Sequence, residues 1–212
     1  MGCSQDEYDE PRGPQGYGEG SRPQIHEAEW WGDCTNTYGE ETKQLVYASY
    51  MGLKAYDAGL PGPVIDLEGK SVLDVGGGPC SLLLKTINRG RCVVVDPCPY
   101  PAWVRHRYTR ASIALLRVRG ETVAVAGDFD EVWMYNVLQH VEDPSLVIKN
   151  ALAAAPYVRM LDWLDTACDE MHPHSLTREY LDSEVGVEGV VVPLDKGGAV
   201  GTAWVYTGPT AR

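Results

Sequence analysis

Short apolar runs alternate with segments of helical spacing along most of the chain. The apolar runs predict five parallel strands, at residues 72–75, 92–96, 113–118, 131–135 and 158–164. Helices are expected over 81–88 and 144–155, the second with Asp143 as its N-cap and Pro144 in its first turn. This alternation is typical of βαβ units and predicts an α/β fold with a mostly parallel sheet and helices on both faces.

The two ends of the chain differ from this pattern. Residues 2–24 contain no Val, Leu, Ile, Phe or Trp, so they cannot offset their ordering entropy by burial, and residues 1–24 are expected to be a disordered tail. Ordered structure is expected from Ile25, with one helix over 40–56 that a Gly- and Pro-rich run ends.

Thr177 is expected to cap a short helix that ends at Ser183. After it, residues 189–192 and 203–206 predict a closing antiparallel hairpin. We therefore expect one domain over 25–212, with a helical N-terminal part at 25–62 and a sheet core at 70–207.

Composition narrows the possible partners. The 30 acidic and 18 basic side chains give a net charge of −12, which disfavours a nucleic-acid partner because affinity for a polyanion comes from phosphate neutralisation. No apolar stretch reaches the roughly 18 residues of a membrane-spanning helix. The six cysteines are scattered without C-x-x-C spacing and are expected to be reduced thiols. We expect a soluble, cytoplasmic protein with no membrane partner.

The clearest chemical signal is VLDVGGGPC over residues 72–80, in which an apolar strand runs into three glycines. Glycine lets a backbone approach a ligand closely, and the start of a helix favours negative charge. The dinucleotide spacing G-x-G-x-x-G fails, because Ser81 stands where the third glycine would be. Asp96 ends the next strand 20 residues after Gly76, where nucleotide-binding units place a carboxylate for ribose hydroxyls. The alternative is a strand-end acid that caps a helix or faces water.

Together with DEVWMYNVLQHVEDP over 130–144, the glycine turn and Asp96 resemble the class I S-adenosylmethionine-dependent methyltransferases, and the likeness runs from about residue 40 to 206. The resemblance implies a Rossmann-like sheet of seven strands, the cofactor S-adenosyl-L-methionine, and 25–62 as a cover over that cofactor. Cys80 departs from the pattern, since many members carry a further glycine there.

The resemblance also implies roles for single residues. The turn formed by Asp74, Gly76, Gly77 and Gly78 would hold the methionine moiety, and Asp96 the ribose. Glu121 would lie by the adenine, with Asp128 as the competing candidate. Asn136 and Val137 would line the sulfonium side, although Val137 could equally be ordinary core. Tyr38 and Tyr47 would fold over the cofactor, with packing of the N-terminal helix as the alternative.

Methyl transfer is an in-line displacement in which positioning supplies much of the acceleration. A hydroxyl acceptor would also benefit from a general base, and His140, His172, His174 and Asp162 all follow strand ends on the acceptor side. Each histidine could instead have a capping or structural role. A metal on His172 and His174 would need a third ligand, such as Asp162 or Asp165, and no metal is predicted.

The sequence therefore predicts a methyltransferase acting on a small-molecule or glycan acceptor, at oxygen. A nucleic-acid methyltransferase is the alternative, disfavoured by the charge and by the lack of N/D-P-P-Y and P-C motifs; aromatic and basic side chains interleaved over 103–110 would suit it, or form a solvated helix face. A non-catalytic cofactor-binding protein and a nicotinamide oxidoreductase are further alternatives. The oligomeric state stays open.

Overall fold

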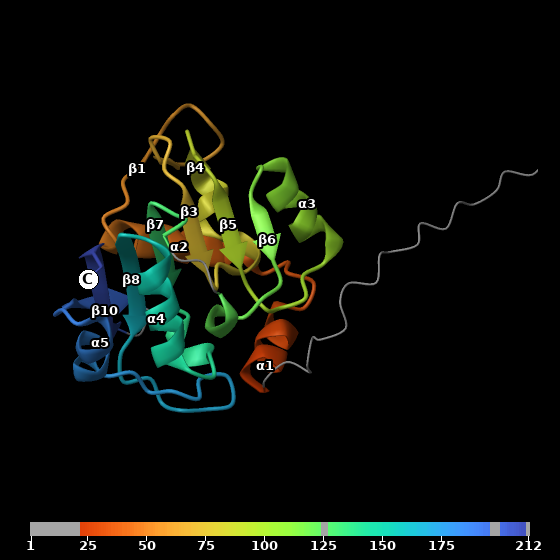
Figure 1. Ribbon diagram of the computed structural model, residues 1–212. Coiled ribbons are helices and arrows are strands. Elements are labelled where there is room, and N and C mark those ends of the chain that lie inside the picture. Colours follow the sequence, from red (N-terminus) through yellow and green to blue (C-terminus); the bar gives the residue numbers. More distant parts are fainter. Residues whose placement is uncertain (1–21, 124–126, 196–199, 211–212) are drawn as a thin grey trace, which may run out of the picture.

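The computed structural model describes residues 22–123, 127–195 and 200–210. Two helices precede the sheet, α1 (Arg22–Trp31) and α2 (Thr37–Tyr50), where the sequence predicts one (Figure 1). The hydrophobic pattern of the sequence does not predict α1, because this helix carries few apolar residues and only Trp31 among them is buried. Residues 1–21 of the predicted disordered tail lie outside the described residues. Residues 22–24 of that tail belong to the first turn of α1, so the helix begins before the predicted start of order at Ile25.

A sheet of seven strands forms the centre of the domain, in the order β6-β5-β3-β7-β8-β10-β9. In chain order its strands are β3 (Val72–Val75), β5 (Cys92–Val95), β6 (Ala114–Leu116), β7 (Glu131–Tyr135), β8 (Tyr157–Trp163), β9 (Val190–Asp195) and β10 (Val200–Pro209). The first five pair in parallel, and β10 pairs antiparallel with both β8 and β9. The α/β fold class, the five parallel strands and the closing hairpin are confirmed.

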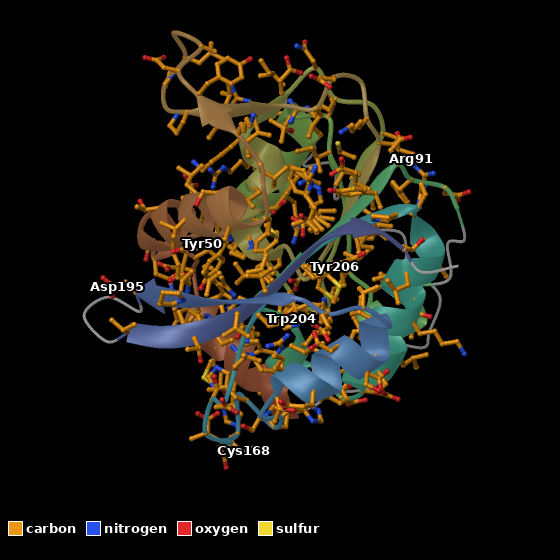
Figure 2. All side chains as sticks on the ribbon, turned by 90° about the vertical axis from the view of Figure 1, so that its left-hand side faces the viewer. Tyr50, Arg91, Cys168, Asp195, Trp204 and Tyr206 are labelled. Atoms are coloured by element: carbon orange, nitrogen blue, oxygen red, sulfur yellow. The ribbon has the colours of Figure 1, made fainter. Side chains whose placement is uncertain are left out.

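Helices cover both faces of this sheet (Figure 1). On one face α2 and α3 (Ala102–Arg110) pack on a core that includes Trp133 and Tyr135. On the other, α4 (Pro144–Ala154) and α5 (Arg178–Val185) cover a core that includes Trp204. Trp204 is fully buried on β10, and its indole N–H donates to Asp182 of α5 at 2.7 Å (Figure 2).

Both predicted helix caps are present. The Asp143 carboxylate accepts a hydrogen bond from the Leu146 N–H at 3.0 Å, and the Thr177 hydroxyl accepts one from the Tyr180 N–H at 3.2 Å. These side chains satisfy N–H groups that the first turn of a helix leaves without a partner, so the beginnings of α4 and α5 follow directly from the sequence.

The helix predicted over 81–88 is wrong. The chain forms two short 3₁₀ helices there, η1 (Gly78–Cys80) and η2 (Leu82–Lys85), followed by β4 (Thr86–Ile87). The Ser81 N–H donates to the Tyr108 hydroxyl and the Leu82 N–H to the Tyr135 hydroxyl, both at 3.0 Å. Hydroxyls from distant elements therefore accept from two N–H groups that would have no partner in the first turn of an α-helix.

A second, small sheet was not predicted. It joins β4 in parallel to β2 (Val64–Asp66), which pairs antiparallel with β1 (Ala55–Tyr56). Among the described residues no helix is long and apolar enough to cross a membrane.

Candidate active site

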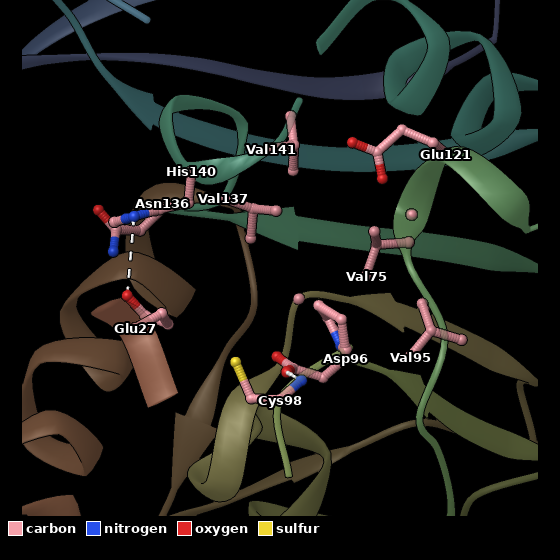
Figure 3. Close-up of a pocket in the computed structure, with 13 residues that line it drawn as sticks. Glu27, Val75, Val95, Asp96, Cys98, Glu121, Asn136, Val137, His140 and Val141 are labelled. Atoms are coloured by element: carbon pink, nitrogen blue, oxygen red, sulfur yellow. Dashed lines mark hydrogen bonds and ion pairs between the residues drawn. The ribbon is translucent and has the colours of Figure 1, made fainter. Parts of the chain in front are cut away.

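A cavity lies at the carboxyl ends of β3, β5 and β7, the edge at which open α/β sheets bind ligands (Figure 3). It holds about 560 Å³ of empty space, its opening to solvent included. We call it the sheet-edge cavity. Its lining residues are Glu27, Val75, Gly76, Val95, Asp96, Pro97, Cys98, Gly120, Glu121, Asn136, Val137, His140 and Val141.

Two glycines of the turn after β3, Gly76 and Gly77, have no room for a side chain. Gly76 has φ +71°, and a Cβ added to it would lie 2.5 Å from Cγ2 of Val137. A Cβ on Gly77 would lie 2.5 Å from Oδ2 of Asp74. Gly78, with φ +64°, donates its N–H to Asp96 at 3.1 Å. Glycine is required here by backbone conformation and by close packing together.

Asp96 borders the sheet-edge cavity at the end of β5. Its Oδ2 accepts from Gly78, and its Oδ1 accepts from the Cys98 N–H and the Tyr100 hydroxyl, each at 2.9 Å. Burial raises the pKa of the carboxyl above its ordinary value, against the lowering effect of these hydrogen bonds. The carboxylate is therefore fixed in one orientation at the cavity wall.

Asp74, by contrast, lies beneath the glycine turn and lines neither this cavity nor the larger one described below. It is fully buried, and its Oδ2 accepts hydrogen bonds from the Tyr135 hydroxyl at 2.8 Å and from the Ser81 hydroxyl. Burial raises its pKa to about 7. Asp74 supports the turn from below.

Glu121 lies in the 3₁₀ helix η3 (Gly120–Thr122) on the far side of the sheet-edge cavity from Asn136 (Figure 3). Its Oε1 accepts from the N–H groups of Glu142 at 2.9 Å and Asp143 at 3.3 Å. Its Oε2 is buried without a hydrogen-bond partner in the described part of the chain. Asp128, the competing candidate, lies instead at the surface, 4.0 Å from Arg91.

The loop after β7 forms a third wall. Asn136 has φ +58°, and its side-chain oxygen accepts from Gln139 at 3.1 Å. The N–H groups of Val137 and Leu138 donate to Oδ1 of Asp162 at 2.9 and 3.2 Å. Asp162 is fully buried behind this loop, lines neither cavity, and has a pKa that burial raises to about 8. It holds the loop in place.

A larger cavity adjoins the first and holds about 1730 Å³ of empty space, its opening to solvent included. We call it the aromatic cavity, because Trp30, Trp31, Tyr47 and Trp163 line it. Tyr47 is buried, and its hydroxyl accepts from the Trp163 indole at 3.1 Å. Tyr38 belongs to α2, but its side chain lies outside those that the structure describes.

The three candidate histidines separate in the structure. His140, in η4 (Leu138–His140), borders both cavities, and His172 borders the aromatic cavity with its ring centroid 4.6 Å from that of His140. His174 borders neither, and its Nε2 lies 3.0 Å from the Val141 carbonyl oxygen. His140 lies 2.9 Å from the Met171 carbonyl through Nδ1, so Nδ1 carries the proton. Burial, with His172 nearby, lowers the pKa of His140 to about 4.

Glu27, on α1, lines both cavities and is not among the site residues predicted from the sequence. Its Oε1 accepts from the Trp31 indole at 2.8 Å, and its Oε2 lies 3.7 Å from Nδ1 of His140 (Figure 3). Burial, with the Asp96 carboxylate nearby, raises its pKa to about 7. The one local signal is an acid four residues before a tryptophan on one helix face. Across the described residues, no three His, Cys, Asp or Glu side chains gather as metal ligands.

Residues 73–154 match the model of the methyltransferase domain family. Residues 73–154 therefore form a methyltransferase domain, within a sheet that has the fold of class I S-adenosylmethionine-dependent methyltransferases. The matched segment of this methyltransferase runs from β3 to the end of α4, and so includes the glycine turn, Asp96, Glu121 and the loop after β7. No curated protein sequence matches the chain.

Solved structures share the fold of this methyltransferase at low identity. The 1,6-didemethyltoxoflavin-N1-methyltransferase of Burkholderia thailandensis, with its substrate and S-adenosylhomocysteine bound, is 13% identical with a TM-score of 0.57, over 95% of this chain and 97% of that one. The YcgJ protein of Bacillus subtilis is 10% identical with a TM-score of 0.54, over 68% and 93%. The N-methyltransferase NodS of Bradyrhizobium japonicum, with S-adenosylhomocysteine bound, is 17% identical with a TM-score of 0.51, over 66% and 78%.

Proposed function

We propose that this methyltransferase transfers the methyl group of S-adenosylmethionine to a hydroxyl oxygen of a small molecule or sugar that binds in the aromatic cavity. One observation carries the proposal. The sheet-edge cavity and the aromatic cavity share Glu27, Asn136 and His140 as lining residues, so a donor in one and an acceptor in the other would meet at that junction.

The sheet-edge cavity has the features that S-adenosylmethionine needs. The turn at Gly76–Gly78 lines a hollow without side chains of its own, so its backbone is open for the methionine moiety to approach. Asp96 presents a fixed carboxylate for the ribose hydroxyls, and the unpartnered Oε2 of Glu121 offers the adenine amino group an acceptor. Asn136 and Val137 would border the sulfonium.

Helix α2 would cover the proposed cofactor site. Tyr47 and Gln44, both buried on α2, line a small hollow that also includes the glycine turn. Tyr47 would act as a wall that excludes water, because its hydroxyl already accepts from Trp163. Tyr38 remains a candidate for the same cover. Asp74 would act through the turn that it supports.

The lining of the aromatic cavity favours a small acceptor over a polyanion. Aromatic faces bury large apolar area and pack on flat rings and sugar faces. The carboxylates Glu27, Glu40 and Asp195 line the same cavity with one cation, Lys43, which pairs with Glu40. This acidic lining would repel phosphate groups. The Burkholderia methyltransferase, which holds 1,6-didemethyltoxoflavin, also supports a small-molecule acceptor.

A hydroxyl acceptor must lose its proton at or after methyl transfer. Of the candidates named from sequence, His140 and His172 border the acceptor side, whereas His174 and Asp162 would act only by positioning the loops around them. His140 is neutral near pH 7 and, with a pKa of about 4, is a weak base.

The protein would work in the cytoplasm. Cys34, Cys80 and Cys92 are buried thiols that form no disulfide within the described part of the chain, and Cys168 is an exposed one on the loop after β8 (Figure 2). Unpaired thiols suit a reducing compartment. Cell fractionation with an antibody against the chain would test this location.

Calorimetric titration tests the cofactor assignment. We expect S-adenosylmethionine and S-adenosylhomocysteine to bind the wild type at micromolar strength, and the Asp96→Ala variant to lose affinity by about 10-fold or more, which is at least about 1.4 kcal/mol. Asp128→Ala is the matched control and should bind as the wild type does. If the wild type binds neither ligand, or binds a nicotinamide cofactor instead, the proposed function is wrong.

A screen with labelled methyl groups then tests the acceptor. Hydroxylated aromatic compounds, sugars, amines and RNA would be offered separately, and the position of the label in each product would be read by mass spectrometry. Label on oxygen of a small molecule or sugar supports the proposal. Label only on nitrogen, carbon or RNA would contradict its acceptor half while leaving the cofactor half intact.

A further inference from the structure

Glu27 lies where the sheet-edge cavity, the aromatic cavity and the hollow above the glycine turn meet, since it lines all three. It comes from α1, which lies beyond the carboxyl ends of the parallel strands, apart from the helices that cover the sheet (Figure 1). A carboxyl in that place faces both the proposed donor site and the proposed acceptor site.

The geometry leaves one carboxylate oxygen of Glu27 available. Oε1 is held by the Trp31 indole at 2.8 Å, which fixes the side chain on its helix. Oε2 lies 3.7 Å from Nδ1 of His140, beyond hydrogen-bond distance, and that N–H is already directed to the Met171 carbonyl. His140 therefore does not compete for a proton on Oε2.

The surroundings of Glu27 oppose its negative charge. Burial and the Asp96 carboxylate are the largest influences, and together they raise its pKa to about 7. A positive charge nearby would reverse this effect. The other groups that face Glu27 or interact with its charge are Glu40 and Lys43 on α2, Cys98 and Tyr100 after β5, and His140 in η4.

We propose that Glu27 is the proton acceptor of the methyl transfer, ionised by the positive sulfonium of the bound donor and protonated once the sulfur has become neutral. This inference rests on the proposed function. In the step, the methyl carbon forms its bond to the acceptor oxygen as the carbon–sulfur bond breaks, and the electron pair of that bond stays on sulfur. The acceptor's proton passes to Oε2 of Glu27, which later releases it to solvent through the aromatic cavity.

The proposal requires a difference between two ligands that differ only in the methyl group and its charge. S-adenosylmethionine binding near pH 7 should expel the proton from the protonated fraction of Glu27, releasing up to about 0.5 proton per site. S-adenosylhomocysteine binding should release less. Groups that meet the ribose or the methionine moiety, Asp96 included, contribute equally to both ligands and cancel in the comparison.

The experiment is titration calorimetry of both ligands in buffers of different ionisation enthalpy, at pH 6, 7 and 8. For the wild type, we expect the preference for S-adenosylmethionine over S-adenosylhomocysteine to rise by about 3- to 10-fold from pH 6 to pH 8. Glu27→Gln should bind both ligands with a preference that does not change with pH. Glu29→Gln, an exposed acid on the same helix, is the matched control and should behave as the wild type.

The outcomes separate the two proposals. If neither ligand binds the wild type, the proposed function fails. If both bind but release equal numbers of protons, or if the difference persists in Glu27→Gln, the role of Glu27 is wrong and the cofactor assignment stands. Glu27→Asp keeps a titratable carboxyl; if Glu27→Gln does not fold, this variant should retain the pH-dependent preference with a shifted midpoint, and an unshifted midpoint would overturn the proposal.

Discussion

The hydroxyl of Tyr135 donates a 2.8 Å hydrogen bond to Asp74, and this bond joins β7 to β3 directly beneath the glycine turn. The same hydroxyl accepts the Leu82 N–H at 3.0 Å. One phenolic oxygen therefore anchors both the carboxyl that supports the turn and the chain that leaves it.

Tyr135→Phe should destabilise the protein, because it leaves the buried Leu82 N–H without its partner and removes a donor from Asp74. We expect a loss of about 1–3 kcal/mol in the free energy of unfolding, measured in urea at pH 7. Tyr206→Phe is the control, since the Tyr206 hydroxyl donates to the Pro209 carbonyl at an exposed site, and it should change stability by less than about 0.5 kcal/mol. Equal effects of the two substitutions would show that the bond to Asp74 is not a support of the turn.

Two glycines with the same φ allow the cost of steric contact to be measured apart from the cost of backbone strain. Gly76 and Gly59 both have φ +71°, but a Cβ on Gly76 would contact Val137, whereas one on Gly59 would meet nothing within 4 Å. Gly59→Ala should cost about 1 kcal/mol through backbone conformation alone. Gly76→Ala should cost more and also weaken S-adenosylhomocysteine binding by about 10-fold or more, because Val137 must move. Calorimetry and urea unfolding of both variants test this, and retained affinity in Gly76→Ala would contradict the packing of the turn.

The strands were predictable from sequence because burial on both faces leaves continuous apolar runs, and β7 at Glu131–Tyr135 matches its prediction at both ends. The caps Asp143 and Thr177 were predictable because their partners lie three residues away. The helix expected over 81–88 failed for the opposite reason. The hydroxyls that redirect that segment come from Tyr108 and Tyr135, far along the chain, and no local pattern reveals them.

The residues of the candidate site also fall into two groups, those whose position follows from the sequence and those whose position does not. Asp96, Glu121 and Asn136 follow strands whose carboxyl ends meet at one edge of the sheet, so their placement at one cavity follows from strand order. Asp162 also follows that order, but its burial behind Val137 and Leu138 depends on how the loop folds back. Glu27 could not be found from the pattern, because its position depends on where α1 docks.

Glu131 is buried and lies at the centre of an ion-pair network across the sheet. Its carboxylate accepts from Arg159 at 2.7 Å, from Lys70 at 2.8 Å and from the Trp133 indole at 3.0 Å. Despite burial, these partners lower the pKa of Glu131 to about 2. Arg159 also donates to the Met51 carbonyl at the end of α2, at 2.7 Å.

Arg159→Met should therefore destabilise the protein by about 3 kcal/mol or more at pH 7, because it leaves a buried carboxylate with less compensation. A carboxyl whose pKa is lowered on folding contributes stability above its unfolded pKa of about 4.5 and loses it as the pH falls towards 2. The difference between variant and wild type should accordingly shrink between pH 5 and pH 3, in urea unfolding monitored by circular dichroism. A difference that stays constant over that range would mean that Arg159 stabilises the fold by packing alone.

Asp162 gives the opposite pH dependence. Burial raises its pKa to about 8, so the folded protein keeps a proton that the unfolded chain loses above about pH 4. Stability from this group is present at low pH and falls as the pH rises from 4 to 8, by at most about 1.4 kcal/mol per pH unit. Asp162→Asn keeps an oxygen for the Val137 and Leu138 N–H groups and cannot ionise, so its stability relative to wild type should increase steadily between pH 5 and pH 8.

Asp165→Asn is the control for the loss of one acidic side chain, since Asp165 is exposed just beyond β8. Its unfolding free energy should follow that of the wild type from pH 5 to pH 8. If Asp162→Asn also followed the wild type, Asp162 would be ionised in the folded state, and the loop after β7 would be held by a charged rather than a neutral carboxyl. The wall that carries Asn136 would then be fixed by a charge at the same end of the sheet as the proposed sulfonium site. In that case Asp162→Asn would weaken S-adenosylmethionine binding, relative to wild type, by a larger factor than it weakens S-adenosylhomocysteine binding.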